Sequence, residues 1–418
     1  MSKFSQIDIT ELKMFWRTLL LSLFGIALSI NAILLYSFGT LVVPFEEAFA
    51  WSRSAQQISI TFLYGGAIVG LQLVGWMNAR HGVKTVNIVS LFIMALGYLA
   101  CTQFIGGSIW TLYIAFTILP IVGMGALAVT WTQLVSLWFS KNRGLALAIA
   151  LSGSGVSATF APGLMAWGIQ NYGWQAPFVF LALLNFLLIP LSLLWFKLPS
   201  QAAAADMHSE AEKKAFEESQ QGIEFSLAIK TKNYWLCGIS LSLIVSAIVG
   251  VVTNTIPILQ DRGFSAVEAG AIFSFFGVSL IIGRMVVGFL LDRFWPPIVA
   301  AASMVLPAIG CLIFLTGTDD ALALSASAAL FGLGTGAEFD IAAFLVARYF
   351  GLKDYSRLFG FQQAIITVAV AVSPLLFALM YNLTGGYTVL LVYCAVCTIV
   401  GCLLLLFLRE PEGNGVQA

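Results

Sequence analysis

The chain has 418 residues, of which 60% are hydrophobic and 10% are charged. A soluble domain carries about 25% charged residues, so this composition excludes an ordinary water-soluble globular protein. Lysine plus arginine equals aspartate plus glutamate at 20 each, which argues against a nucleic-acid partner because such proteins carry a basic excess.

The apolar residues fall in long blocks of the length that a helix needs to cross a bilayer, about 20 residues. In lipid a chain must satisfy its own backbone groups, so each block is predicted to be a helix. The predicted spans are 16–43, 57–78, 85–104, 109–137, 144–167, 176–197, 233–258, 266–291, 297–317, 321–347, 357–381 and 386–408. The fold class is therefore an all-α membrane protein with twelve transmembrane helices in two pseudo-symmetric six-helix bundles.

The stretch between the sixth and seventh spans differs from the rest because it is rich in Ala, Glu, Lys, Ser and Gln. We predict that 198–232 is a solvated cytoplasmic linker between an N-terminal bundle, 1–197, and a C-terminal bundle, 233–418. Residues 223–229 alternate apolar and polar side chains, which predicts that this end of the linker lies on the membrane surface.

Basic residues give the orientation. With both termini in the cytoplasm, 17 of the 20 lysines and arginines fall on that side, Arg53 and Arg262 fall outside, and Arg284 lies within a span. Loops rich in Lys and Arg stay in the cytoplasm. The chain is therefore predicted to be a multi-pass, monomeric protein of the inner (plasma) membrane, in contact with the lipid bilayer and with cytoplasmic N- and C-termini.

The two halves resemble each other. Gly-Leu-Gln-Leu-Val-Gly at 70–75 in span 2 matches Gly-Arg-Met-Val-Val-Gly at 283–288 in span 8, at an offset of 213, and Arg80 matches Arg293 at the same offset. Gly-Met-Gly at 123–125 in span 4 corresponds to Gly-Leu-Gly at 332–334 in span 10. Two such halves predict a substrate cleft at their interface, near the bilayer midplane.

The loop after span 2 reads Gly75-Trp-Met-Asn-Ala79-Arg80-His81-Gly82-Val83-Lys84, and its counterpart reads Gly288-Phe-Leu-Leu-Asp292-Arg293. Over its whole length the chain resembles the major facilitator superfamily, whose signature in this loop is Gly, an acid, Arg and Gly followed by basic residues. The first loop has Ala79 where the family has the acid. The resemblance implies a cytoplasmic gate that is formed by Arg80, Gly82, Asp292 and Arg293.

Within that superfamily the chain is most similar to the monocarboxylate-porter branch and its bacterial relatives. The similarity rests on the stretch 38–47 followed by Trp51-Ser-Arg53, on 138–150 followed by 152–155, and on Arg284 in span 8. Those relatives carry an aspartate one turn before the arginine, where this chain has Leu280. The resemblance implies a carrier of small organic anions whose proton partner lies elsewhere.

Three ionisable side chains lie deep in predicted spans: Arg284, Glu338 and Asp340. Helix rise places them roughly 12–15 Å from the cytoplasmic ends of spans 8 and 10, where charges usually face protein or water and pair with each other. We expect Arg284 to bind a substrate carboxylate, and Glu338 or Asp340 to pair with Arg284 otherwise and to couple protons. The two acids project about 200° apart, so the sequence leaves open which one faces the cleft. The alternative is a salt bridge that only holds span 8 to span 10.

Further polar side chains in the spans are candidates for lining the cleft. The predicted substrate-binding residues beside Arg284 are Asn31, Tyr64, Gln133 and Asn254, and Thr130 and Gln363 are weaker candidates. Such side chains also bind neighbouring helices, for about 1 kcal/mol or less each, so packing is the alternative role for each of them.

The sequence thus predicts a secondary active transporter whose partners are a small organic acid, either a monocarboxylate or an aromatic acid, and a proton carried in symport. The alternative within transport is an exporter of a neutral or cationic compound by proton antiport, which Ser157-Ala158 disfavours because drug antiporters have Gly-Pro there. A membrane enzyme would need a histidine, aspartate or cysteine constellation at one depth, and a sensor would need an output domain. We predict no catalytic residues, no metal ligands and no cofactor.

Overall fold

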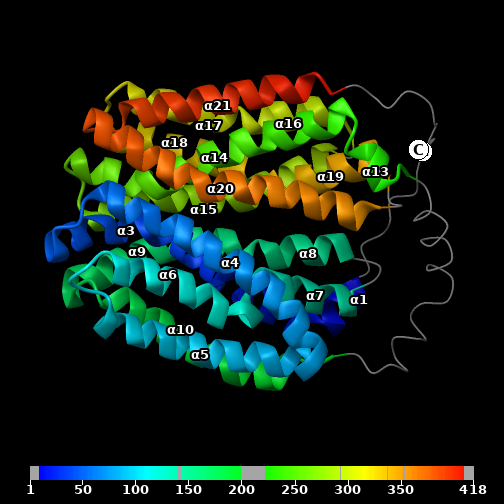
Figure 1. Cartoon of the computed structure of the whole chain (residues 1–418), viewed down its shortest axis with the longest axis horizontal. Coiled ribbons are helices and arrows are strands. Elements are labelled where there is room, and N and C mark those ends of the chain that lie inside the picture. Colours follow the sequence, from blue (N-terminus) through cyan, green and yellow to red (C-terminus); the bar gives the residue numbers. More distant parts are fainter. Residues whose placement is uncertain are drawn as a thin grey trace. The chain divides into compact units, whose positions relative to one another are not determined.

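The structure is a computed structural model that describes residues 9–139, 143–198, 222–291, 293–336, 338–351 and 354–408. Within these ranges the chain is helical (Figure 1), and the only β pairing is an isolated bridge between Gly222 and Gly351. The helices are α1 Ile9–Met14, α2 Trp16–Ala27, α3 Ile30–Phe49, α4 Arg53–His81, α5 Val83–Phe104, α6 Trp110–Val122, η1 Met124–Ala126, α7 Ala128–Trp138, α8 Arg143–Leu151, α9 Gly153–Tyr172, α10 Ala176–Trp195, α13 Phe225–Ala228, α14 Lys232–Asp261, α15 Ala266–Leu291, α16 Pro296–Met304, α17 Leu306–Leu315, α18 Ala321–Thr335, α19 Glu338–Phe350, α20 Tyr355–Thr384 and α21 Thr388–Leu406.

The helices reproduce the predicted spans. In the described part of the chain, 10 helical segments are long and apolar enough to cross a membrane, and each coincides with one predicted span. The other two spans are the fourth and the tenth, and each consists of two shorter helices, α6 with α7 and α18 with α19. The prediction of an all-α membrane fold with twelve spans is confirmed, and the fourth and tenth spans, which lack a single long apolar helix, occupy the same place in each half of the sequence.

The first span differs in detail from its prediction of 16–43. The helix breaks at Leu28 and Ser29, where Ser29 has an extended backbone (φ −61°, ψ 137°), and α3 then continues through Pro44 to Phe49. Ala50 ends α3 in the left-handed region with φ 54°. The polar residues that follow Pro44 are therefore part of a helix and not of a loop.

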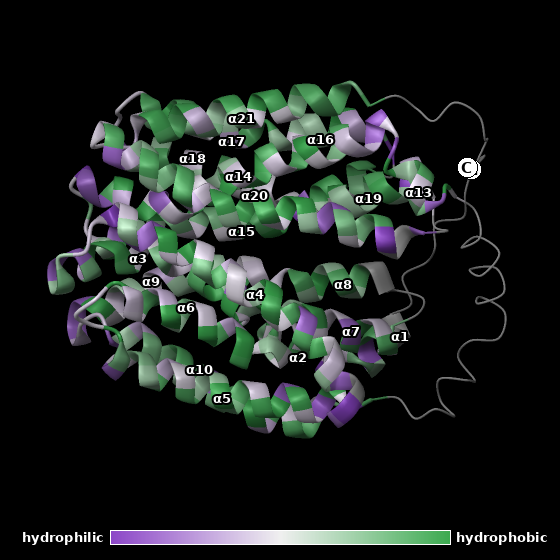
Figure 2. Cartoon of the chain, viewed as in Figure 1, coloured by the Kyte–Doolittle hydropathy of each residue, from purple (hydrophilic) through white to green (hydrophobic). Residues whose placement is uncertain are grey.

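The outer helix surfaces are apolar, as a lipid-facing surface must be. On α5 the exposed side chains recur at helical spacing, and they are Val89, Phe92, Ile93, Leu96 and Leu99. The opposite face of α5 is buried and includes the polar Asn87 and Ser90. Figure 2 shows the same excess of hydrophobic residues along the helices, with hydrophilic residues concentrated near helix ends. This distribution identifies a multi-pass membrane protein.

By its internal contacts the chain divides into two compact units. Unit 1 contains Met1–Met207 and Val252–Val278, and unit 2 contains His208–Val251 and Ser279–Ala418. The division follows the sequence halves except in α14 and α15, where the segment from the middle of α14 to the middle of α15 packs with unit 1. The predicted boundaries at 197 and 233 concern the sequence repeat and stay a prediction.

Unit 1 is built from packed helix pairs, and every second connection between its successive membrane crossings lies at the same end. The main pairs are α4 with α6, α5 with α10, α3 with α9, and α2 with α7, α8 and α9. The ring of Phe45 lies 5.6 Å from that of Trp174, and Trp51 Nε1 donates to the carbonyl oxygen of Gly107 at 3.2 Å. The corners α3/α4, α5/α6 and α9/α10 therefore meet at the same end of unit 1, as successive membrane crossings require.

Unit 2 packs α17 against α18 and α21, α16 against α21, and α19 against α20. The first part of α14 joins it through a hydrogen bond of 2.6 Å from Ser373 Oγ to Ser246 Oγ. The structure also packs the linker end against unit 2, and its predicted position on the membrane surface stays a prediction. Asp354 Oδ2 accepts a 2.7 Å hydrogen bond from the backbone N–H of Phe225 in α13, and the Arg357 guanidinium lies over the Phe225 ring.

Candidate functional site

Two glycines bring α15 into backbone contact with the end of α18 in unit 2. A Cβ added to Gly283 would lie 2.4 Å from the carbonyl oxygen of Leu333, and one added to Gly336 would lie 2.2 Å from that of Leu280. Small residues allow such close crossings between membrane helices. The crossing places the residue after Gly283 beside the end of α18.

The tenth span is interrupted at this crossing. The helix α18 ends at Thr335, Gly336 forms its C-terminal cap, and α19 begins at Glu338. The last carbonyl groups of a helix have no intrahelical donor, and an unsatisfied carbonyl at membrane depth costs several kcal/mol. The break therefore needs a hydrogen-bond donor from another element.

Arg284 supplies that donor. Its Nε donates a 2.9 Å hydrogen bond to the carbonyl oxygen of Gly336, and the residue is only 8% exposed. The terminal nitrogen Nη1 is also a buried atom. The prediction that Arg284 lies inside the protein, beside the tenth span, is thus consistent with the geometry, but the sequence reasoning missed that its partner includes a backbone carbonyl. The alternating glycines at 332, 334 and 336 were the available signal.

The corresponding break in the fourth span is satisfied by neutral groups. In unit 1, Asn87 Nδ2 donates to the carbonyl oxygen of Gly125 at 2.8 Å, and Trp131 Nε1 donates to that of Ala126 at 3.1 Å. Neutral donors are therefore sufficient for such a break. A guanidinium brings five N–H donors and a full positive charge, which is more than one carbonyl requires, and a buried charge is stable only beside an anion.

An acid follows the break directly. Glu338 is the first residue of α19 and is 8% exposed, with Oε2 fully buried. A carboxylate is favoured at a helix N-terminus by the helix dipole. Glu338 stands two positions after Gly336, whose carbonyl oxygen accepts the hydrogen bond from Arg284. The side chain of Asp340 lies outside the described residues, so the alternative between the two acids stays a prediction. Arg284 and Glu338 together give unit 2 a buried cation and a buried acid at one helix break.

Four of the predicted binding residues belong to unit 1. Asn254 is buried and its Nδ2 donates to Thr253 Oγ1 at 3.1 Å, whereas Tyr64 is half-buried and Gln133 is exposed. Asn31 follows the break in the first span, and its Oδ1 is buried without a hydrogen-bond partner among the described residues. Among these four residues, Asn31 thus has a buried side-chain oxygen, Oδ1, that can accept a hydrogen bond from a ligand or water.

Thr130 and Gln363, the weaker candidates, differ in burial. Thr130 in unit 1 is 1% exposed, and its hydroxyl has no hydrogen-bond partner within the described ranges. Gln363 in unit 2 is half-buried. Its neighbour Gln362 is fully buried against Gly238 of α14, and both polar atoms of its side chain lack a partner in the described part of the chain. The sequence reasoning missed Gln362 because periodicity alone does not tell which of two adjacent glutamines faces inward.

The predicted cytoplasmic gate is described in part. Arg80 is exposed and lies 5.7 Å from the centroid of the Trp76 ring, with no ion pair to any described residue. Gly82 has φ 82°, a conformation that side chains rarely adopt, and it separates α4 from α5. Arg293 lies over the Phe289 ring, and Asp292 lies outside the described residues. The gate role of these four residues stays a prediction.

Comparison with known proteins agrees with this architecture. The family model of the Major Facilitator Superfamily matches residues 19–339 and 297–418. The uncharacterized MFS-type transporter YcxA of Bacillus subtilis (strain 168) is 24% identical over 395 residues, covering 93% of each chain. Monocarboxylate transporter 13 of Bos taurus is 24% identical over 383 residues, or 89% of this chain and 84% of its own. The gallate transporter of Pseudomonas putida is 24% identical over 362 residues, or 75% of this chain and 78% of its own. All three relatives are named as transporters.

Proposed function

Since the chain belongs to the Major Facilitator Superfamily, we propose that it is a secondary active transporter that carries a small organic anion by alternating access with proton symport. The proposed substrate is a monocarboxylate or an aromatic acid. Two of the similar proteins are named for carboxylic acids, monocarboxylate in one case and gallate in the other. Because the identity to each is only 24%, these names support the substrate class and not one particular acid.

The observation that carries this proposal is the buried guanidinium at the helix break. Arg284 donates one N–H to the Gly336 carbonyl, and a guanidinium is a planar fork that matches a carboxylate with two parallel hydrogen bonds. The N-terminus of α19 begins at the same break, and interrupted helices in transporters direct such positive dipole ends toward anionic substrates. Both features favour a carboxylate.

Proton coupling follows from competition for one cation. We propose that, when no substrate is bound, the Glu338 carboxylate balances the positive charge of Arg284. A substrate carboxylate that binds the guanidinium removes this compensation, so that protonation of Glu338 relieves the repulsion between two adjacent anions. Substrate and proton then cross together, which is symport. Export of a cationic compound is disfavoured by the same guanidinium, which would repel it.

We further propose an inner-membrane location with both termini in the cytoplasm. Support comes from unit 1, where Lys84 Nζ donates to the carbonyl oxygen of Leu193 and Trp138 Nε1 donates to that of Lys197. These bonds gather basic residues at the end away from the α3/α4 corner. Basic ends of membrane bundles face the cytoplasm.

The test is a thermal-shift screen of the purified protein against short-chain and aromatic carboxylic acids at an acidic and at a neutral pH. The primary amide of each acid serves as its matched neutral control. The proposal expects at least one acid to raise the melting temperature, more at acidic pH, while its amide has no effect. Equal stabilisation by acid and amide, or stabilisation only by cations, would contradict it.

A further inference from the structure

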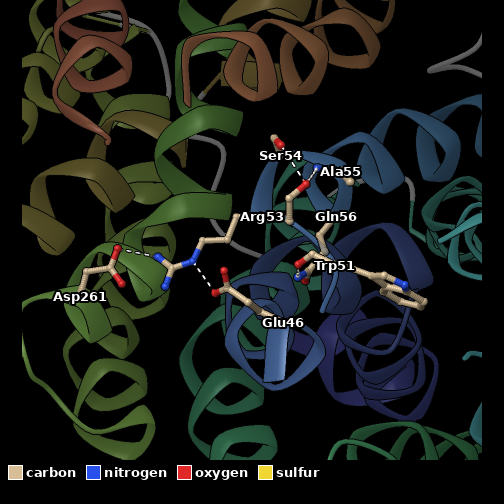
Figure 3. Close-up of polar contacts among 8 residues, drawn as sticks. Glu46, Trp51, Arg53, Ser54, Ala55, Gln56 and Asp261 are labelled. Carbon is tan, nitrogen blue, oxygen red and sulfur yellow. Dashed lines mark hydrogen bonds and ion pairs between the residues drawn. The ribbon is translucent and has the colours of Figure 1, made fainter. Parts of the chain in front are cut away.

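Three charged residues form a network at the end of unit 1 where the α3/α4 corner lies. Arg53 Nε lies 2.8 Å from Glu46 Oε2, and Arg53 Nη1 lies 2.5 Å from Asp261 Oδ2. Figure 3 shows the guanidinium between the two carboxylates, with Glu46 on α3, Arg53 at the start of α4 and Asp261 at the end of α14. One cation therefore joins three helices.

The pair of Arg53 and Glu46 is held by local structure. The corner between their helices is tight, because Ala50 turns in the left-handed region and Ser52 Oγ accepts a 3.3 Å hydrogen bond from the backbone N–H of Ala55. Trp51 anchors the corner by stacking on Phe49 with ring centroids 4.5 Å apart. Glu46 and Arg53 are thus brought together by the tight corner between α3 and α4.

Asp261 reaches Arg53 only through tertiary packing, since the two residues are 208 positions apart in the sequence. Below Asp261 the same helix face is buried, and Gln57 Nε2 of α4 donates to Thr253 Oγ1 of α14. A Cβ on Gly39 of α3 would lie 3.1 Å from Pro257 Cδ. The end of α14 therefore packs closely on α3 at Gly39 and is hydrogen-bonded to α4 through Gln57.

We infer that Glu46, Arg53 and Asp261 form an ionic latch that holds the end of α14 on the α3/α4 corner in this conformation and releases it during each transport cycle. This inference rests on the proposed function, because a cycle of alternating access must open this end of the molecule. The carboxylates that meet Arg53 are half-exposed, at 42% for Glu46 and 41% for Asp261, whereas Arg53 is 15% exposed. Exposed ion pairs are weak, so such a latch opens readily.

The order of release follows from the geometry. When Asp261 leaves, it becomes hydrated, and Arg53 keeps the carboxylate of Glu46, so no buried charge loses its only counter-ion. Glu46 and Arg53 belong to the same α3/α4 corner, so a movement of α14 leaves their pair in place. Asp261 is thus the moving part of the latch, and Glu46 is the group that keeps Arg53 oriented for its return.

The experiment measures how often the latched end opens. Thr253 is fully buried two turns below Asp261, so a Thr253→Cys reporter is protected while the latch is closed. The six native cysteines are all buried, and the protein without the reporter gives their background. With protein in lipid nanodiscs and no substrate present, Asp261→Asn is expected to raise the maleimide labelling rate of the reporter by about 2- to 5-fold, the effect of losing one exposed ion pair.

Two matched variants separate the latch from general charge effects. Glu47→Gln removes the same charge from the neighbouring exposed carboxylate and is expected to leave labelling unchanged. The charge swap Arg53→Asp with Asp261→Arg restores an opposite-charge pair between the α3/α4 corner and α14 and is expected to return labelling toward the original rate. High salt should raise labelling of the protein with an intact latch more than that of Asp261→Asn.

The inference is overturned if Asp261→Asn labels at the original rate, or if Glu47→Gln accelerates labelling as much as Asp261→Asn does. If Asp261→Asn folds poorly, the test is how the labelling rate of Thr253→Cys, with Asp261 intact, changes with salt. A labelling rate that is independent of salt contradicts the latch. Labelling needs no substrate, so it is independent of the thermal-shift screen. A screen without a stabilising acid refutes the substrate class alone, and unchanged labelling beside a stabilising acid refutes the latch alone.

Discussion

Arg284 donates a 2.9 Å hydrogen bond from Nε to the carbonyl oxygen of Gly336. One side chain thus links the charge in unit 2 to the interrupted backbone of the tenth span. A ligand that draws the guanidinium away from Gly336 leaves a carbonyl without its donor, so ligand binding and the shape of the break are coupled. The fourth span has a similar break with neutral donors, which lack this coupling to an anion.

Glycine substitutions test the structural repeat. Gly70 and Gly283 are 213 positions apart, and a Cβ on each would lie 2.8 Å from the carbonyl oxygen of Pro120 and 2.4 Å from that of Leu333, respectively. Since Pro120 and Leu333 differ by the same offset, both halves use the same crossing. Gly70→Ala and Gly283→Ala are each expected to destabilise the protein by about 1–3 kcal/mol, as overpacking does, which a lower melting temperature would report.

The matched controls lie five residues further along the same helices. A Cβ on Gly75 or Gly288 would meet nothing within 4 Å, and replacing glycine by alanine inside a helix gains up to about 1 kcal/mol. Gly75→Ala and Gly288→Ala should therefore melt at the original temperature or slightly above it. Equal effects of all four substitutions would show that the predicted crossings are wrong.

Glu338→Gln tests the proton-coupling role, because glutamine preserves the shape of the side chain but does not titrate. In proteoliposomes we expect it to abolish substrate accumulation driven by a pH gradient, while exchange of labelled for unlabelled substrate across the membrane persists. A lower melting temperature is also expected, since Arg284 loses a compensating charge. Asp340→Asn is the comparison variant. If that variant loses coupling and Glu338→Gln retains it, our assignment of the proton to Glu338 is incorrect.

Asp354→Ala tests the docking of the linker end. It removes the acceptor for the Phe225 backbone N–H, so α13 should detach more often from the corner before α20. Limited trypsin digestion is expected to cleave faster after Lys230 and Lys232, which flank this segment. Asp319→Ala, which removes an exposed carboxylate in another loop, provides the control. Identical cleavage rates in the two variants would argue against docking through Asp354.

Much of the fold was predictable from the sequence because lipid imposes a simple rule on apolar blocks. Each span has to be long, apolar and helical, so the number and approximate position of the spans follow from composition. The paired motifs at 70–75 and 283–288 indicated the repeat, and the first glycine of each lies at a close helix crossing, which small residues allow. Arg284 stood out because an arginine within a span is costly unless it has a function.

The rest depended on contacts that no local pattern encodes. The break in the first span at Ser29 carries no glycine or proline, and the carbonyl partner of Arg284 belongs to a different helix. Arg53 and Asp261 looked like ordinary solvated charges at helix ends, because their pairing joins positions 208 residues apart. The helix α3 also extended past Pro44, where the change from apolar to polar residues suggested that the span had ended.

The most direct test of the account is the affinity of Arg284→Lys for the acid that stabilises the protein best. Lysine keeps the positive charge but cannot form the two parallel hydrogen bonds of a guanidinium, so we expect affinity to fall by at least about 10-fold. Arg17→Lys, which alters an exposed arginine on α2, should bind as the original protein does. Arg284→Lys with unchanged affinity for the acid would contradict the proposed role of Arg284 in anion recognition.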